Sequence, residues 1–166
     1  MNPIGVVICN YNKKDFVLQC VQSVLESKEK NFDIYVVDNA SSDGSAEALK
    51  KAYGNQITVI ENKENLGGSG GFNTGLRIVR DKGYSYFMCL DDDAAVDENA
   101  LSVLYHYMEE HTDTGMAGCR VYHTQMPDYI QQSGLLIDFD NCTAKTIGAD
   151  MLEDGSLPDV IECDTV

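Results

Sequence analysis

The stretch Ile4-Gly5-Val6-Val7-Ile8-Cys9-Asn10-Tyr11-Asn12 decides the fold class of this chain. It begins as a continuous β-prone run, which Asn10 to Asn12 then break. A strand that covers one face of a sheet alternates apolar and polar residues, whereas a continuous apolar run is typical of a strand buried on both faces of a parallel sheet. This segment therefore predicts a first strand in an α/β protein.

Strand and helix patterns alternate along the chain beyond this first strand. Apolar residues at helical spacing predict helices over 15–26, 45–53, 72–81 and 97–111. Further β-prone runs predict strands over 32–38, 57–60 and 84–90. This order is the signature of a parallel sheet with right-handed crossovers, so the expected fold class is α/β with a mostly parallel central sheet.

The pattern changes after Gly115, where short strand-like segments follow one another without a strong helix between them. Strands are expected over 116–122, 134–138, 143–147 and 160–166. The chain ends inside the last of these, so we expect it to be C-terminally incomplete.

Composition argues against several classes of partner. The 166 residues carry 27 acidic and 12 basic side chains, a formal net charge of -15. Contacts from Lys and Arg to phosphates dominate affinity for nucleic acids, so the sequence predicts no nucleic-acid partner. Adhesion of this segment to an anionic membrane is disfavoured for the same reason. A phosphorylated ligand would need a bound divalent cation or a helix N-terminus to offset the charge.

The cysteines and the N-terminus bear on the cellular compartment. The six cysteines are scattered, without a Cys-x-x-Cys pair, at positions 9, 20, 89, 119, 142 and 163. Reduced, buried thiols in a cytoplasmic protein are the favoured interpretation, with a disulfide framework or a zinc site as the alternative. The apolar run over 4–9 is too short for a signal peptide or a membrane span, so the expected location is the cytoplasm.

Three adjacent aspartates give the sharpest chemical signal. Asp91, Asp92 and Asp93 directly follow the strand predicted over 84–90. Adjacent carboxylates repel one another and are costly to desolvate, so the arrangement calls for a compensating cation. Because residues i and i+2 of an extended segment point the same way, Asp91 and Asp93 are expected to converge on one Mg²⁺ or Mn²⁺ ion. The alternative is a solvated turn that precedes the next helix.

A glycine-rich segment, residues 65–71, precedes the third predicted helix. It fails the dinucleotide-binding pattern, because Asn73 stands where the last glycine is required. It fails the NTPase phosphate-loop pattern too, because Leu76 and Arg77 replace Lys-Ser/Thr. What remains is a loop that allows a ligand to approach backbone N–H groups at a helix start, or simply a loop packed on the sheet.

Two single residues are weaker candidates. Asp38 ends the second predicted strand, where a carboxylate can accept a hydrogen bond from the N3–H of uracil or thymine, or can cap a turn. Arg77 is expected one turn into the helix after the glycines, where it can reach a phosphate or simply lie on the surface. Most of these candidates lie at the carboxyl ends of strands, where ligands bind in parallel sheets.

In order and spacing, four segments resemble the inverting glycosyltransferases of family 2, which have the GT-A fold. The segments are Val7 to Asn12, Val36 to Gly44, Asn65 to Gly75 and Leu90 to Asp93. The glycine segment with three aspartates is most similar to the galactofuranosyltransferase and rhamnosyltransferase branches. The resemblance implies a Rossmann-like sandwich in a single domain, 1–166, with a nucleotide-binding part over 1–114 and the start of an acceptor-side part over 115–166.

The resemblance also implies roles for individual residues, with a UDP- or dTDP-linked sugar such as galactofuranose or rhamnose as the donor. Tyr11 and Asn12 would line the nucleoside pocket, and Asp38 would hold the base. Mn²⁺ or Mg²⁺ would bridge the diphosphate, with Asp92 near the ribose or the donor sugar. The candidate donor-binding residues are Tyr11, Asn12, Asp38, Asn65, Gly67, Gly71, Arg77, Asp91 and Asp92, and the candidate metal ligands are Asp91 and Asp93.

The acceptor side is less defined. The implied acceptor is a cell-surface glycan or a lipid-linked molecule, and membrane association, at the inner face, is expected only through parts absent from this chain. The catalytic base of the family is expected beyond Val166, so a donor-binding but inactive chain is one open alternative. A non-catalytic carbohydrate- or partner-binding module of the same fold is another. A sugar-nucleotide pyrophosphorylase is the third, although 10–14 lacks the glycines which those enzymes carry after the first strand.

Overall fold

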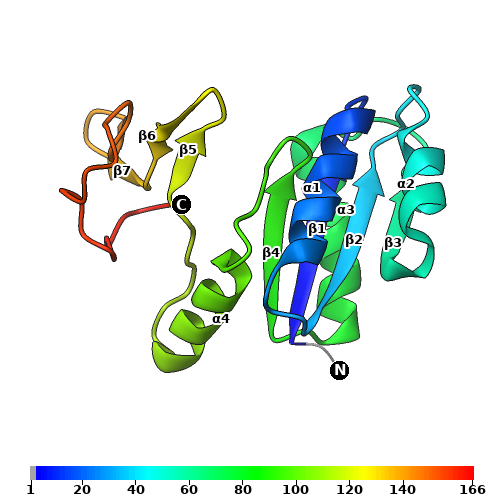
Figure 1. Ribbon diagram of the computed structural model, residues 1–166, viewed down its shortest axis with the longest axis horizontal. Helices are drawn as coiled ribbons and strands as arrows, with labels where there is room; N and C mark the ends of the chain where they lie inside the picture. Colours follow the sequence, from blue (N-terminus) through cyan, green and yellow to red (C-terminus); the bar gives the residue numbers. More distant parts are fainter. Residues whose placement is uncertain (1–2) are drawn as a thin grey trace. The chain divides into compact units, whose positions relative to one another are not determined.

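The computed structural model describes residues 3–166 (Figure 1). Contacts between residues divide the chain into two compact units, with the division between Ser102 and Val103. The helix α4 (Ala100–Glu110) runs through this division. Each unit is therefore described by itself.

A four-stranded parallel sheet forms the centre of the first unit. Its strands are β1 (Ile4–Asn10), β2 (Phe32–Asp38), β3 (Ile57–Glu61) and β4 (Tyr86–Asp91), in the order β3-β2-β1-β4. Its helices are α1 (Lys14–Glu26), α2 (Ser45–Tyr53), the short 3-10 helix η1 (Gly54–Gln56) and α3 (Gly67–Lys82). The predicted alternation of strands and helices, and with it the α/β class, is confirmed.

The core lies on both sides of β1 and β2. Val6, Val7 and Ile8 have no exposed surface, as expected for a strand buried on both faces. Val7 packs with Val37 and with Val79 of α3, on one face of the sheet. Figure 1 shows α1 on the opposite face of the sheet from α3. The continuous apolar run at the N-terminus thus marks the middle of a three-layer unit.

The strand β4 departs from the prediction in its start and in its burial. It begins at Tyr86 instead of Tyr84, because backbone pairing with β1 starts there: Tyr86 lies opposite Ile4, and its N–H donates to the carbonyl of Pro3 at 2.9 Å. Along β4 partly buried side chains alternate with exposed ones, and Phe87 is 63% exposed. This strand is therefore only half buried, and the expected burial of the Cys89 thiol was wrong, because Cys89 is exposed.

The glycine-rich segment is not a loop, because α3 begins at Gly67 and not at residue 72. The N–H of Gly67 donates to the side-chain Oδ1 of Asn65 at 2.8 Å, which satisfies one amide at the helix start. A Cβ atom on Gly71 would lie 2.3 Å from Cys9 Sγ, and one on Gly75 would lie 2.4 Å from Val7 Cγ1. Two of the glycines therefore allow the helix to approach β1 closely.

Beyond the end of α4, the second unit contains two antiparallel hairpins. One pairs β5 (Val121–His123) with β6 (Met126–Gln132), and the other pairs β7 (Leu135–Asp138) with β8 (Thr143–Thr146). The strand expected over 116–122 begins only at Val121, and β6 was not predicted. The strand expected over 160–166 is wrong: this segment makes a single bridge, from Thr165 to Leu135.

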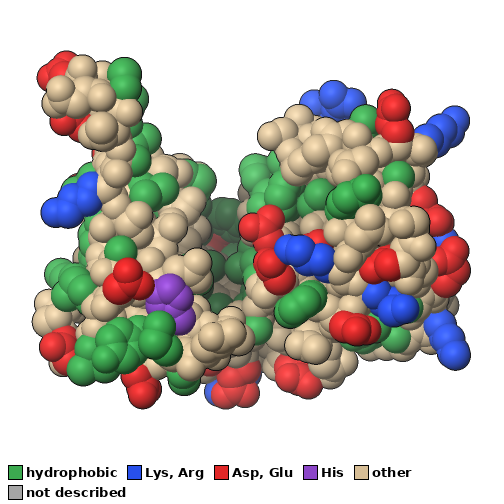
Figure 2. Space-filling model, turned by 90° about the horizontal axis from the view of Figure 1, so that it is seen from above, with side chains coloured by type: hydrophobic (Ala, Val, Ile, Leu, Met, Phe, Trp, Pro, Cys, Tyr) green, Lys and Arg blue, Asp and Glu red, His purple; other side chains and the backbone are tan. Residues whose placement is uncertain are grey.

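Large apolar side chains are common on the surface of the second unit (Figure 2). The exposed ones from Met116 onward are Met116, Val121, Tyr122, Met126, Tyr129, Leu136, Ile137, Phe139, Met151, Leu152, Val160 and Val166. Within residues 3–166, no helix has both the length and the apolar character needed to cross a bilayer.

The close approach of α3 to β1 gives a prediction about stability. Gly75→Ala should lower the free energy of unfolding by about 1–3 kcal/mol, because the added methyl group meets Val7 in a packed core. Gly68→Ala, in the same helix, is the control: a Cβ there meets nothing within 4 Å, and alanine favours helix by up to about 1 kcal/mol. Urea unfolding of both variants measures the difference, and equal stability would contradict the packing explanation.

Candidate functional site

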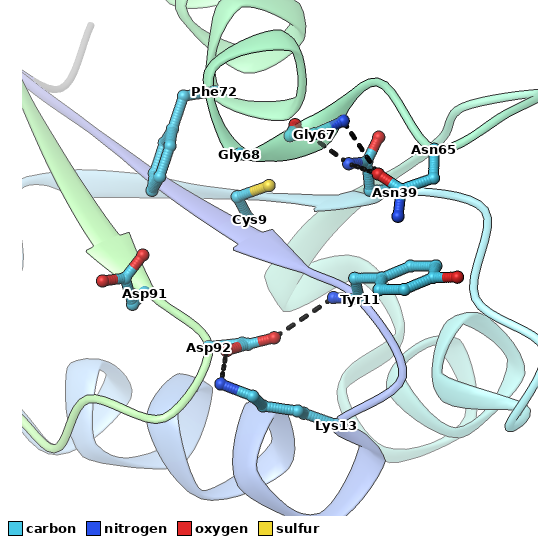
Figure 3. Close-up of a pocket in the computed structure, with 10 residues that line it drawn as sticks. All are labelled: Cys9, Tyr11, Lys13, Asn39, Asn65, Gly67, Gly68, Phe72, Asp91 and Asp92. Carbon is cyan, nitrogen blue, oxygen red and sulfur yellow. Dashed lines mark hydrogen bonds and ion pairs between the residues drawn. The ribbon is translucent and has the colours of Figure 1, made fainter.

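A pocket of about 280 Å³ opens at the carboxyl edge of the sheet in the first unit (Figure 3). It lies where β1 and β4 end and where α3 begins. The residues that line it are Cys9, Tyr11, Lys13, Asn39, Asn65, Gly67, Gly68, Phe72, Asp91 and Asp92. Ligands bind at this edge in parallel sheets, so the pocket is the candidate functional site.

This pocket is lined by half of the candidate residues that the sequence suggested. The lining includes Tyr11, Asn65, Gly67, Asp91 and Asp92. Asn12, Asp38, Gly71, Arg77 and Asp93 are not part of it. The structure therefore brings the three strand-end segments and the helix start together, but it gives the second group of residues other surroundings.

Five lining residues were not predicted: Cys9, Lys13, Asn39, Gly68 and Phe72. Lys13 carried a signal that was missed, because a basic residue just after the first strand stands out in a chain of net charge -15. Asn39 directly follows Asp38, and Gly68 belongs to the glycine segment. Cys9 and Phe72 offered no such signal, because an apolar side chain that lines a pocket looks like a core residue in the sequence.

The three aspartates, residues 91–93, form an acidic turn and not an extended segment. β4 ends at Asp91 and the backbone turns at Asp92, so the predicted common direction of Asp91 and Asp93 does not apply. The Oδ2 of Asp92 accepts the N–H of Tyr11 at 3.1 Å, and its Oδ1 lies 3.1 Å from Lys13 Nζ. Asp92 is only 6% exposed, so it is the best buried of the three carboxylates.

Lys13 is the compensating cation of this turn in the structure. Its Nζ also lies 2.6 Å from Asp93 Oδ2. The hydrogen bond from Lys13 holds the pKa of Asp93 below its ordinary value, and the bonds to Asp93 and Asp92 raise the pKa of Lys13. The expectation that the aspartates need a positive charge is therefore met in part by a side chain of the protein itself.

The carboxylates of the pocket decide whether it fits the implied divalent cation. In the described chain, no group of three or more His, Cys, Asp or Glu side chains is arranged to hold a metal. Mg²⁺ and Mn²⁺, however, are commonly held by one or two carboxylates together with substrate phosphates and water. Asp91 lines the pocket, and its carboxylate has no hydrogen bond or ion pair to the protein among residues 3–166. Its free oxygen atoms fit such a cation.

The start of α3 supplies the opposite electrostatic character. Gly67 and Gly68 line the pocket, and a Cβ on either would meet nothing within 4 Å. The first N–H groups of a helix lack partners within it, and the helix dipole is positive at this end. An anionic group can therefore approach this backbone closely, opposite the carboxylates of the acidic turn.

Asp38 has a structural role in the arrangement seen here. It is 3% exposed, and its oxygen atoms accept the side-chain amide of Asn10 at 2.8 Å and the N–H of Ser41 at 2.9 Å. Asp38 thus ties the end of β1 to the loop after β2. Asn10 is also fully buried, and its Oδ1 has no hydrogen-bond partner among residues 3–166. Contact of Asp38 with a base stays a prediction.

Asn12 is a turn residue in the structure. Its φ is 54°, a left-handed conformation that asparagine tolerates better than most residues. Its side-chain Oδ1 accepts the N–H of Ser42 at 2.8 Å, and its own N–H donates to Ser41 Oγ at 2.9 Å. These bonds lock the loops after β1 and β2 together at the rim of the pocket.

Arg77 is farther from the start of its helix than the sequence indicated. Because α3 begins at Gly67, Arg77 lies about 15 Å along the helix axis from that end, at about 1.5 Å per residue. The expected position one turn into the helix was wrong, since the glycines belong to the helix.

Asn39 organises the helix start through all its side-chain polar groups. Its amide donates to Asn65 Oδ1 at 2.8 Å and to the carbonyl of Gly67 at 3.1 Å. Its Oδ1 accepts from Asn62 Nδ2 at 3.0 Å and from the N–H of Leu66 at 3.1 Å. Asn39 is 2% exposed, so these bonds are shielded from water. It therefore holds the segment before α3 against the end of β2.

Removal of these bonds should be costly. Asn39→Ala leaves buried donors and acceptors without partners, and we expect the free energy of unfolding to fall by about 1–3 kcal/mol. Asn73→Ala in α3 is the control: Asn73 is exposed and its side chain has no hydrogen bond to the described residues, so a change within about 0.5 kcal/mol is expected. Denaturant unfolding compares them, and an Asn39 variant as stable as its control would refute this role.

The thiols should differ in reactivity with pH. Burial, reinforced by Asp92 and Asp91, raises the pKa of Cys9 to about 11. The thiolate is the reactive form, so a raised pKa slows reaction near neutral pH. In folded protein near neutral pH, iodoacetamide should modify the exposed Cys142 and spare Cys9, whose labelling should rise only as the pH approaches 11. Peptide mapping measures this, and equal rates at neutral pH would oppose it.

Comparison with known proteins agrees with this geometry. Residues 5–161 match the profile of the family described as glycosyl transferase family 2. The teichoic acid poly(glycerol phosphate) polymerase of Staphylococcus epidermidis is 27% identical over 146 residues, which cover 85% of this chain and 19% of that protein. The chain thus spans about a fifth of the length of this relative.

A second relative and a solved structure extend the comparison. The UDP-Glc:alpha-D-GlcNAc-diphosphoundecaprenol beta-1,3-glucosyltransferase WfaP of Escherichia coli is 29% identical over 109 residues, 66% of this chain and 42% of that protein. The mannosyltransferase PcManGT of Pyrobaculum calidifontis, solved in complex with GDP-Man and Mn²⁺, superposes with a TM-score of 0.60 at 19% identity. That match covers 74% of this chain and 36% of the other, and it shows the shared fold.

The family profile covers nearly all of the chain and includes every segment that lines the pocket. Together with the α/β sandwich and the site at its carboxyl edge, it establishes that this chain belongs to glycosyl transferase family 2.

Proposed function

We propose that the pocket binds a nucleotide-diphospho-sugar and that the protein transfers the sugar, with inversion, to an acceptor hydroxyl. One observation carries the proposal: the acidic turn and the glycine start of α3 face the same pocket. A diphosphate has both the negative charge that suits a helix N-terminus and the oxygen atoms that complete the coordination of a carboxylate-bound cation.

The proposed division of labour follows from the contacts of each residue. Gly68 presents its backbone N–H group to the diphosphate, Gly67 leaves room for its close approach, and Tyr11, which is 45% exposed, offers its ring to the nucleoside. Asp91, and Asp93 when its carboxylate is released from Lys13, would hold Mn²⁺ or Mg²⁺. The ion supplies Lewis-acid stabilisation of the leaving diphosphate when bound. Asp92 keeps the hydrogen bond that it accepts from the Tyr11 N–H, and it faces the donor.

The identity of the donor is a narrower part of the proposal. The WfaP relative is named for a UDP-linked sugar, and PcManGT was solved with a GDP-linked one. We propose a UDP- or dTDP-linked donor, with galactofuranose and rhamnose as the first candidates from the sequence resemblance. A carboxylate oxygen of Asp38 still has a free lone pair. It would accept a hydrogen bond from the N3–H of the pyrimidine once the loop that follows β2 has moved locally.

The acceptor and the location complete the proposal. The named relatives support a cell-surface glycan or a lipid-linked acceptor, because one makes a teichoic acid polymer and the other uses a diphosphoundecaprenol-linked sugar. All six cysteines are free thiols, which is usual in the reducing cytoplasm. The catalytic base that deprotonates the acceptor is proposed to lie outside residues 1–166.

Calorimetric titration with UDP and with dTDP tests donor binding. We expect binding that needs Mn²⁺ and that weakens at least about tenfold in Asp91→Asn, since the free carboxylate is lost. Asp81→Asn removes the same charge from a carboxylate that pairs with Arg80 on α3, and it should bind like wild type. The preferred nucleotide identifies the base.

Two outcomes would count against the proposal. If UDP or dTDP bound without metal, or if the Asp91 variant bound as tightly as its control, the proposed cation–diphosphate site at Asp91 would be wrong. Metal-dependent binding by the full-length protein without any sugar transfer would instead indicate a non-catalytic binding module of this fold.

A further inference from the structure

Lys13 has a position that the proposed function leaves without a role. It directly precedes α1, and its Nζ lies between two carboxylates, 2.6 Å from Asp93 Oδ2 and 3.1 Å from Asp92 Oδ1. Figure 3 shows this ammonium group next to Asp92 at the wall of the pocket. Among the ion pairs of residues 3–166, both that involve the acidic turn use Lys13.

The acidic turn depends on this ammonium group in the metal-free protein. The Asp92 side chain is 9% exposed, and a buried carboxylate is costly without a positive partner. Asp93 is the next residue, so the two negative charges also repel each other. The N–H of Tyr11 donates to Asp92 but carries no full charge. Lys13 is therefore the group that makes this arrangement of carboxylates stable.

A divalent cation and Lys13 compete for the same atom. A cation held by Asp91 and Asp93 must use a carboxylate that now accepts a hydrogen bond from Lys13 Nζ. Two further positive charges close to an ammonium group are repelled by it. The Lys13 side chain is 43% exposed and has a flexible four-carbon stem, so it can leave Asp93 without any movement of the backbone.

We propose that Lys13 is a built-in counter-ion of the acidic turn, which a divalent cation displaces far more readily when it arrives with a diphosphate than when it arrives alone. The identity of the cation and of the diphosphate rests on the proposed function. The cation alone then binds weakly, because it must expel Lys13. A cation–diphosphate complex binds in one step, because its negative oxygen atoms accept hydrogen bonds from the Lys13 ammonium group as this group leaves Asp93. Lys13 thus makes the binding of the cation depend on the diphosphate.

Titration of the whole chain with Mn²⁺ alone, without nucleotide, tests this competition. Lys13→Met keeps the length of the apolar stem and removes the ammonium group, and we expect about tenfold tighter binding of Mn²⁺ than in wild type. Lys13→Gln is a second uncharged variant with the same expected direction. Lys13→Arg keeps the charge and should bind like wild type. Lys28→Met is the matched control, since it breaks the separate surface ion pair of Lys28 with Glu98.

Thermal unfolding gives an independent readout. In a chelator, Lys13→Met should unfold at a lower temperature than wild type, and Mn²⁺ should raise its midpoint more than it raises that of wild type. Equal or weaker Mn²⁺ binding by both folded uncharged variants would overturn the proposal. Failure of wild type to bind UDP with Mn²⁺ would instead overturn the proposed function, so the two failures are distinguishable.

Discussion

The parallel pairing of β1 with β2 on one side and β4 on the other is the constraint on which the rest of the structure depends. The pairing sets Asn10 beside Asp38 and Cys9 beside Asp91. Three segments that are up to eighty residues apart therefore end at one edge of the sheet. The same pairing buries β1 on both faces, which gives the sheet its core. Stability and the position of the site thus have one origin.

Polar side chains at this edge form a connected support under the pocket. Asn10, Asp38 and Ser41 join the loops after β1 and β2, and Asn39 joins the loop after β2 to the start of α3. These groups are mostly buried, and their hydrogen bonds are correspondingly well shielded from water. The start of α3 is consequently held in place before any ligand arrives. A preformed site of this kind lowers the ordering cost of binding.

Electrostatics explains how an acidic protein could bind the proposed diphosphate. The positive charge that would balance the diphosphate must come almost entirely from the pocket itself, because the chain as a whole carries 27 acidic and 12 basic residues. The structure provides it from three sources: the positive end of α3, the ammonium group of Lys13, and carboxylates that can hold a cation. Membership of glycosyl transferase family 2 agrees with this combination. Because the chain spans less than half of the length of the two named relatives, the acceptor belongs to the proposed function.

The sequence by itself determined the α/β class, the order of elements up to residue 90, the family and half of the residues that line the pocket. These follow from local periodicity and from residue types at strand ends, which are properties of short segments. Only the tertiary structure decided that the glycines at 71 and 75 pack α3 on β1, that Arg77 lies far from the helix start, and that Asp92 and not Asp93 joins Asp91 in the pocket. Only it paired Lys13 with the acidic turn, because that contact joins segments eighty residues apart and depends on how the turn after β4 directs each carboxylate.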